Sequence, residues 1–261
     1  MQEILGIVLT SMQQDMDGLN HVALNLANVA TPGYKREVVA LRPFADVMGQ
    51  MQASGASDLD SAAAMAGSGL GLQMRLDNRP GTVTQTGEPM DFAIGGDGFF
   101  EVTTDSGPAY TRQGNFQVDP RGRLVTSQGY PVMGNNGEIY LTTRTPVVDV
   151  AGNVTEPQAT TGPSAGEPGA PVAQVKLVKF DSPGTMKPMG QGLMAAGTGM
   201  TVMKQSDVQL HQGALENANV NTITEMTQMM MGVRHFESMQ KIAQGYDDMI
   251  GTAINKLGDL T

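Results

Sequence analysis

The sequence predicts an α+β protein in which a mainly antiparallel β domain is inserted between two terminal helices. Residues 1–30 and residues 222–261 each carry a row of apolar side chains at alternating spacings of three and four. Between them, residues 81–207 hold short apolar runs separated by turns rich in glycine, aspartate and asparagine. The first helix leads into the β domain and the last helix leads out of it, so we expect the two helices to pair antiparallel, like a coiled coil.

The first helix carries one apolar row and further apolar surface outside that row. The row consists of Leu5, Val8, Met12, Leu19, Val22, Leu26 and Val29. Only Asp15 interrupts it, while Ile7, Met16 and Leu24 lie outside it. One partner helix would therefore leave part of the apolar surface uncovered.

The first helix should end within residues 25–36. Thr31 precedes a proline, Pro32 has no amide hydrogen, and Gly33 favours positive φ, so three successive residues oppose helix continuation. We place the N-terminal assembly helix in residues 1–36. Residues 37–80 are expected to be a linker with a short helix, which is indicated by Phe44, Val47, Met48 and Met51.

The β domain is expected in residues 81–207. Its predicted strands are 92–94, 99–102, 109–112, 115–118, 124–126 and 172–180. The regular spacing of the first five predicts a meander of antiparallel strands. Residues 154–170 are rich in proline, glycine and threonine and are expected to form a flexible excursion.

The last segment, residues 208–261, is expected to be a lead-in followed by a helix. Thr222 and Glu225 fit a capping box, in which each side chain would bond the other residue's free amide. The apolar row that follows contains Met229, Val233, Phe236, Ala243, Ile250, Ile254 and Leu257. A second row, which includes Ile242 and Met249, lies roughly a quarter turn away at about 100° per residue. The predicted assembly interface consists of the first of these two rows and the apolar row of residues 1–30.

Composition excludes several classes of partner. The 261 residues carry a formal charge of -10, which disfavours nucleic acid and anionic lipid. The chain contains no cysteine and no tryptophan, and aromatic residues make up only 5%, which argues against a deep ligand pocket. No apolar run reaches 18 residues, so we expect no membrane insertion, and the first residues lack the basic region of a signal peptide.

We expect no catalytic, metal or cofactor site. The three histidines, His21, His211 and His235, do not have a zinc-binding spacing. Asp97, Asp105 and Asp119 sit in predicted turns, where such side chains bond backbone amides. Together with Glu101 they leave open an alternative of another class, a periplasmic glycan hydrolase. A β-rich adhesin is the other alternative.

A methionine cluster on the second helix indicates contact with protein. Met226, Met229, Met230 and Met231 lie at helical spacing, and methionine adapts to irregular neighbours. The two helices together have more apolar surface than their mutual seam can bury. Repeated packing through one asymmetric contact produces a ring or an open helical polymer.

Three separated motifs resemble those of the bacterial flagellar rod and hook axial proteins. They are residues 25–35 (NLANVATPGYK), residues 92–102 (FAIGGDGFFEV) with 110–116 (YTRQGNF), and residues 215–221 (LENANVN) with 225–226 and 234–237 (RHFE). The matching positions at the two ends are Asn25, Ala27, Asn28, Thr31, Pro32, Gly33, Tyr34, Asn219, Val220, Glu225, Phe236 and Glu237. Residues 31–34 and 234–237 look closer to the proximal rod members of the family than to the distal ones.

The resemblance implies a non-enzymatic structural subunit of the periplasmic basal-body rod. Its partners would be copies of itself, other rod and hook subunits, and the flagellar type III export apparatus. The terminal helices would form an inner tube and the β domain an outer layer, and the polymer would transmit torque. A distal rod or hook protein of the same family is the alternative within this class.

Overall fold

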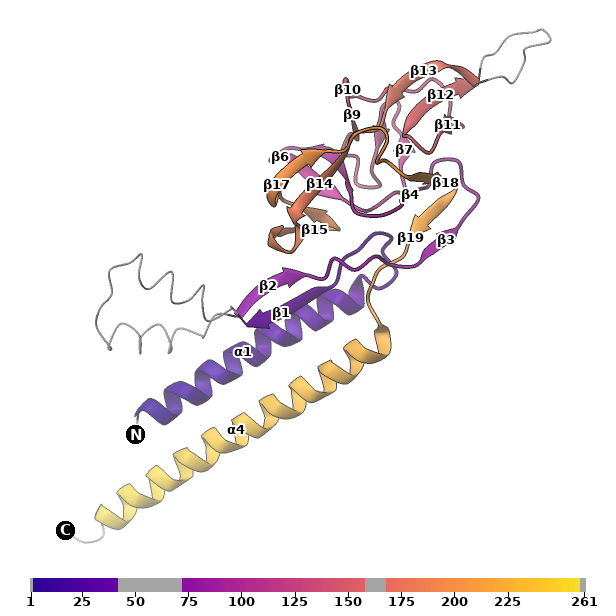
Figure 1. The fold of residues 1–261 in the computed structure, drawn as a ribbon. Coiled ribbons are helices and arrows are strands. Elements are labelled where there is room, and N and C mark those ends of the chain that lie inside the picture. The colour runs from indigo at the N-terminus through magenta and orange to yellow at the C-terminus, as the bar shows by residue number, and fades with distance from the viewer. Residues whose placement is uncertain (1, 42–71, 158–167, 259–261) are drawn as a thin grey trace, which may run out of the picture. The chain divides into compact units, whose positions relative to one another are not determined.

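The computed structural model describes residues 2–41, 72–157 and 168–258 (Figure 1). Contacts within the chain define two units. The helix unit lies within Met1–Ala27, Glu37–Met74 and Asn221–Thr261, and the β unit comprises Asn28–Arg36 and Arg75–Val220. Two long terminal helices and a mostly antiparallel β region make the chain an α+β protein, as the sequence predicted.

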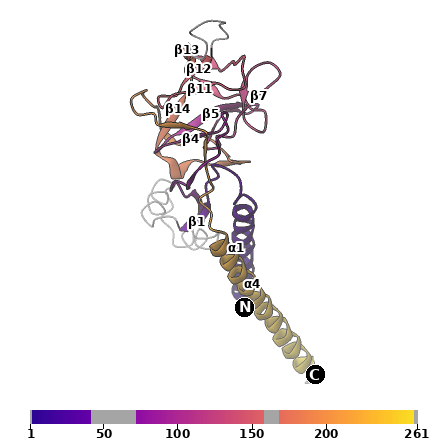
Figure 2. The same cartoon turned by 90° about the vertical axis from the view of Figure 1, so that its right-hand side faces the viewer.

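The helix unit contains α1 (Gln2–Ala27) and α4 (Thr222–Gly258), which pack against each other. They run in opposite directions and lie side by side in both views (Figures 1 and 2). Strand β1 (Glu37–Leu41) packs on α1 and pairs with β2 (Leu72–Leu76). These two strands occupy parts of the chain where the sequence predicted a linker; Phe44, Val47, Met48 and Met51 lie outside the described residues.

The helix boundaries follow local chemistry. Helix α1 ends at Ala27, before the Thr31-Pro32-Gly33 sequence that opposes helix continuation, so Val29 lies beyond the helical row. The predicted capping box of α4 is wrong. Asn221 caps this helix instead, because its Oδ1 accepts hydrogen bonds from Ile223 N (3.0 Å) and Thr224 N (3.1 Å).

The β unit is built from short strands, and its named strand pairs are all antiparallel. A six-stranded sheet has the order β15-β16-β6-β5-β14-β17, so it is only partly a meander. The strands of the unit are β3 (Val83–Gln85), β4 (Phe92–Ile94), β5 (Phe99–Thr104), β6 (Gly107–Thr111), β7 (Gln117–Val118), β8 (Leu124–Val125), β9 (Met133–Gly134), β10 (Gly137–Glu138), β11 (Val147–Val148), β12 (Asn153–Pro157), β13 (Pro168–Gln174), β14 (Leu177–Ser182), β15 (Pro188–Gly190), β16 (Leu193–Met194), β17 (Thr198–Val202), β18 (Leu210–Gln212) and β19 (Ala214–Glu216), with a 3-10 turn at Pro183–Thr185.

Two sequence predictions for the β unit need correction. The expected strand 172–180 is two strands, β13 and β14, which belong to different sheets. The two ends of the expected flexible excursion 154–170 belong to β12 and β13, which pair with each other, while residues 158–167 lie outside the described residues. Backbone hydrogen bonding between these strands outweighs the low strand propensity of their prolines and glycines.

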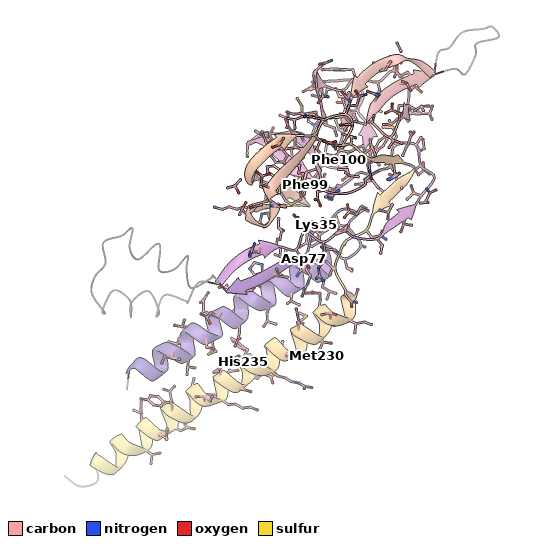
Figure 3. The ribbon with its side chains drawn as sticks, in the orientation of Figure 1. Lys35, Asp77, Phe99, Phe100, Met230 and His235 are labelled. Atoms are coloured by element: carbon pink, nitrogen blue, oxygen red, sulfur yellow. The ribbon has the colours of Figure 1, made fainter. Side chains whose placement is uncertain are left out.

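Two apolar clusters form the core of the β unit. Phe99 and Phe100 are consecutive residues of β5, so their side chains point to opposite faces of the sheet (Figure 3). Phe100 meets Phe116 in the larger cluster, with ring centroids 4.9 Å apart. Phe99 meets Phe180 at 5.8 Å in the smaller cluster, which also contains Tyr110. The six-stranded sheet is therefore buried on both faces around β5.

The turn between β7 and β8 leads to a prediction about acid sensitivity. Asp119 accepts hydrogen bonds from Arg121 N (2.8 Å), Arg123 N (2.8 Å) and Arg123 Nε (2.9 Å). Desolvation alone would raise the pKa of Asp119, but the bonds from Arg123 and Arg121 outweigh it and hold the pKa below its ordinary range.

A depressed carboxyl pKa in the folded state stabilises the protein above the unfolded pKa, and this stability is lost as pH falls through the folded pKa. We expect Asp119→Asn to lower the unfolding free energy at pH 7, while leaving it nearly unchanged at the acid end. Urea unfolding of both proteins from about pH 7 down to the acid end measures this. Equal differences between the proteins at every pH would contradict it.

Candidate assembly site

Part of the predicted interface is buried or half-buried on α1 and α4, the two helices that pack against each other. Val8 is buried, and Met12, Leu19, Val22 and Leu26 of α1 and Met229, Phe236 and Ala243 of α4 are half-buried. A Cβ added at Gly232 would lie 2.9 Å from Leu19 Cδ2, so glycine permits the close approach of the two helices there. For Leu5, Ile254 and Leu257 only the helical backbone is described.

A polar pair explains the break in the apolar row of α1. Asp15 Oδ2 lies 2.6 Å from His235 Nδ1 on α4, and Figure 3 labels His235 on that helix. In the sequence, Asp15 interrupts an apolar row and His235 belongs to no metal-binding spacing. No spacing rule connects two positions so far apart in the chain. The pair connects the two helices at this point.

Helix α1 cannot cover the whole of α4. The helices have 26 and 37 residues, which corresponds to lengths of roughly 39 and 55 Å at about 1.5 Å per residue. Two further positions of the predicted row, Val233 and Ile250, remain exposed.

Helix α4 carries two exposed apolar stripes besides the face that meets α1. Stripe A consists of Ile223, Met226, Met230 and Val233, spaced 3-4-3, with 78%, 49%, 56% and 40% of their surface exposed. Stripe B consists of Met231, Ile242 and Met249. At about 100° per residue, the two stripes lie on opposite sides of the packed face, each roughly 110–120° from it. On α1, Leu9 and Met16 are likewise exposed and seven residues apart.

A buried polar contact connects the N-terminal and C-terminal motifs within the helix unit. Asn25 Nδ2 donates to Glu37 O (2.8 Å) and Glu225 Oε2 (3.3 Å), and Asn25 Oδ1 accepts from Glu37 N (2.9 Å). Asn25 and Glu225 are both almost fully buried. The side chain of Glu37, on β1, also contacts α1, because its Oε2 lies 3.0 Å from His21 Nδ1. Asn25 thereby fixes β1 to α1 and places Glu225 of α4 against them.

Residues 28–36 form a turn that is fixed in the β unit. Thr31 N donates to Asn28 O, and Tyr34 N donates to Thr31 O. Gly33 N donates to Glu216 O (2.6 Å), and Gly33 has a φ of 68°. A Cβ on Gly33 would lie 2.3 Å from the backbone of Arg112, so glycine is needed for both its conformation and its size.

Asn219 holds the same turn from the C-terminal side. Its Oδ1 accepts from Arg36 N (2.7 Å), and its Nδ2 donates to Asp77 O (2.7 Å) and Arg79 O (2.9 Å). Asn219 N also donates to Tyr34 O (3.3 Å). The motif residues at the two ends of the chain therefore meet in the β unit as well as in the helix unit.

A buried charge cluster lies beneath this turn. Glu216 Oε1 accepts from Lys35 Nζ (2.7 Å) and Gly81 N (2.8 Å), and Glu216 Oε2 lies 3.6 Å from Arg112 Nη1. The side chains of Lys35, Glu216 and Arg112 are 1%, 2% and 4% exposed. Lys35, which is labelled in Figure 3, also donates from Nζ to Arg79 O (3.0 Å), the same carbonyl that accepts from Asn219 Nδ2. Lys35 and Arg112, both buried, therefore share the carboxylate of Glu216.

Burial dominates the titration of the two cations. It lowers the pKa of Lys35 and of Arg112, while the Glu216 carboxylate acts on both in the opposite direction. All three residues lie inside the family motifs, but the sequence alone did not predict that they contact one another. The signals in the sequence were the basic residue Lys35 after the TPGY turn and the single carboxylate, Glu216, of the last strand.

The remaining motif residues do not converge on one point. Ala27 is exposed at the end of α1, and Glu237 is exposed on α4. Pro32, Val220 and Phe236 are half-buried, Pro32 in the turn, Phe236 on α4 and Val220 just before that helix.

The carboxylates of the hydrolase alternative are held by cations or turns. Glu101 Oε2 lies 2.8 Å from Lys176 Nζ, and Asp97 lies 3.3 Å from Lys179. A surface hollow of about 450 Å³ in the β unit is lined by Asp97, Lys179, Asp181 and Asp207 among others, but by neither Glu101 nor any aromatic side chain. Of the four carboxylates of that alternative, only Asp97 lines this hollow, so the structure does not bring Glu101, Asp105 and Asp119 together with it there.

In residues 2–41, 72–157 and 168–258, no three or more histidine, aspartate and glutamate side chains gather as a metal site. Neither α1 nor α4, over its described length, combines the length and hydropathy needed to cross a membrane.

Comparisons with known proteins identify the family. A family described as "Flagellar hook protein FlgE/F/G D1 domain" matches residues 93–169, and one described as "Flagellar basal body rod FlgEFG protein C-terminal" matches residues 211–256. The flagellar basal-body rod protein FlgF of Rhizobium meliloti is 30% identical over 99% of both chains. FlgF of Escherichia coli is 32% identical over 94% of this chain and 96% of its own. FlgG of Bacillus subtilis is 31% identical over 95% and 96%. The chain therefore belongs to the FlgE/F/G family of flagellar hook and basal-body rod proteins, and within it is most like FlgF, with FlgG next.

Proposed function

We propose that this chain is a structural subunit of the flagellar basal-body rod, in its proximal part, and that it performs no catalysis. Family membership supports the rod assignment and its contacts with other rod and hook subunits. The observation that carries the mechanism is the pair of exposed apolar stripes on α4. Stripe A and stripe B lie on two sides of a helix whose third side already meets α1.

The stripes favour a polymer over a closed dimer. A twofold dimer uses one self-complementary surface, whereas two different surfaces on one subunit suit head-to-tail contacts that repeat indefinitely. An exposed row of isoleucine, methionine and valine is also costly for a free subunit. We infer that copies of this chain and homologous rod subunits cover the stripes, so that the paired helices form a coiled-coil-like assembly domain.

The proposed division of labour follows the sequence. We propose that residues 1–36 and 208–261 contribute assembly, that residues 37–80 connect, and that residues 81–207 form the outer β domain. Within these ranges, β1 belongs to the helix unit and residues 208–220 belong to the β unit. Contacts group residues 28–36 with the β unit, which supports the turn as the joint between the two. Such a polymer would transmit torque through stiff interfaces, and its subunits would leave the cell through the flagellar type III apparatus.

Replacing one residue of stripe A tests the proposal. We expect Met230→Asp to abolish rod assembly and swimming, because the interface would bury an unpaired carboxylate. The matched control is Met200→Asp on β17, where the methionine is 50% exposed, close to the 56% of Met230. The readouts are swimming and electron microscopy of basal bodies from cells whose own copy is deleted.

Basal bodies with complete rods built from the Met230→Asp chain would contradict the proposal. The alternative of a distal rod or hook subunit predicts the same loss of assembly, but tagged subunits would then lie farther along the axis. Tag position therefore separates the proximal assignment from the alternative without affecting the assembly claim.

A further inference from the structure

Exposed methionines are concentrated on the helix unit. Of the described methionines, Met226, Met230 and Met231 are 49%, 56% and 64% exposed within less than two turns of α4. Met230 is labelled on this helix in Figure 3. The β unit has two methionines of similar exposure, Met189 (45%) and Met200 (50%). Two others, Met186 and Met194, are buried in its smaller core cluster.

Accessible methionine reacts with peroxides. The thioether sulfur attacks one oxygen of hydrogen peroxide, an S–O bond forms, and the O–O bond breaks. The proton of the transferred oxygen joins the departing hydroxide, so the products are methionine sulfoxide and water. Sulfur loses two electrons and the peroxide gains them. Methionine sulfoxide reductases reverse the change.

We propose that Met226, Met230 and Met231 form an oxidation site that switches off assembly of the free subunit. The inference rests on the proposed function, because it requires these side chains to enter a subunit interface. A sulfoxide oxygen is a strong hydrogen-bond acceptor, and burying it against apolar neighbours without a donor is unfavourable. Stripe A supplies only apolar side chains, Ile223 and Val233, beside Met226 and Met230.

Oxidation at these positions leaves the subunit folded. The three side chains point away from the α1 seam, and their backbone bonds are those of an ordinary α-helix. The loss therefore concerns association, and the reductase restores it. In an assembled rod the same side chains are covered, so oxidation acts before assembly.

The parent chain of the test carries Met16→Leu and Met249→Leu, because these two methionines of the helix unit are 52% and 64% exposed and would also oxidise. The test compares two further leucine variants of this parent. One is Met226→Leu/Met230→Leu/Met231→Leu, and the control is Met189→Leu/Met200→Leu, which removes the equally exposed methionines of the β unit. Each protein is treated with hydrogen peroxide, and sulfoxides are located by peptide mass spectrometry. Self-association and co-assembly with a FlgG-type rod subunit are measured by analytical ultracentrifugation.

We expect peroxide to raise the concentration needed for assembly at least about tenfold in the parent chain, which corresponds to ~1.4 kcal/mol. The control variant should lose assembly to the same extent, the helix variant should keep it, and reductase should restore the parent. Equal loss in the helix variant, or no loss in an oxidised parent, would overturn the inference. If untreated parent chains do not associate, the proposed function itself fails, and that result is distinct because no oxidation is involved.

Discussion

Replacing Glu216 by Gln is expected to lower the unfolding free energy of the β unit by about 3 kcal/mol. The substitution keeps the shape of the side chain but removes the charge that faces Lys35 at 2.7 Å and Arg112 at 3.6 Å. Two buried cations would then lack their counter-charge. Urea unfolding of the full chain, followed by a signal from the β unit, measures the loss.

A partly exposed ion pair provides the control. Glu101 lies 2.8 Å from Lys176, and their side chains are 12% and 25% exposed, so Glu101→Gln should cost at most about 1 kcal/mol. Adding Lys35→Met to Glu216→Gln should recover part of the larger loss, because it removes one of the two unpaired cations. Equal effects of the two glutamate substitutions would show that burial of the cluster does not matter.

Gly33→Ala is expected to destabilise the β unit by about 3 kcal/mol or more, the sum of a positive-φ cost and an overpacking cost. Positive φ costs a non-glycine residue roughly 1–2 kcal/mol, and the new Cβ would overlap the Arg112 backbone at 2.3 Å. The turn would have to move away from Arg112, which would disturb the bond from Gly33 N to Glu216 O. Thermal unfolding, with the same β-unit signal, gives the shift in stability.

Gly87→Ala separates the two causes. Gly87 also has a positive φ of 77°, but nothing lies within 4 Å of its added Cβ. It should therefore show only the conformational cost, about 1–2 kcal/mol. If Gly33→Ala costs no more than Gly87→Ala, the close approach to Arg112 does not constrain the turn.

The sequence predicts the helices and many strands because their signals are local. Thr31-Pro32-Gly33 stops a helix through backbone geometry alone, and strands such as β4 alternate with glycine and aspartate turns. The capping error is also instructive. Thr222 fits the capping pattern, yet Asn221 is one residue earlier, has the stronger preference for the position, and leaves Glu225 to meet Asn25.

Long-range partners could not be predicted in the same way. Asp15 looked like an interruption until α4 placed His235 beside it, and Lys35, Arg112 and Glu216 come from three distant segments. Strands β12 and β13 have many prolines and glycines, and only their mutual pairing makes them strands. In contrast, the spacing of apolar residues alone predicts that each helix has more apolar surface than one partner helix can cover, because this prediction does not depend on which residues lie opposite.

The central claim is that neighbouring subunits cover the stripes of α4. The chain has no cysteine, so a single Met230→Cys substitution gives one reactive site, and Met194→Cys, at a position 3% exposed, gives the unreactive baseline. Maleimide labelling of purified basal bodies is compared with labelling of the dissociated subunit. We predict that maleimide labels position 230 rapidly in the free subunit and much more slowly in the basal body. Equal labelling in both states would contradict it.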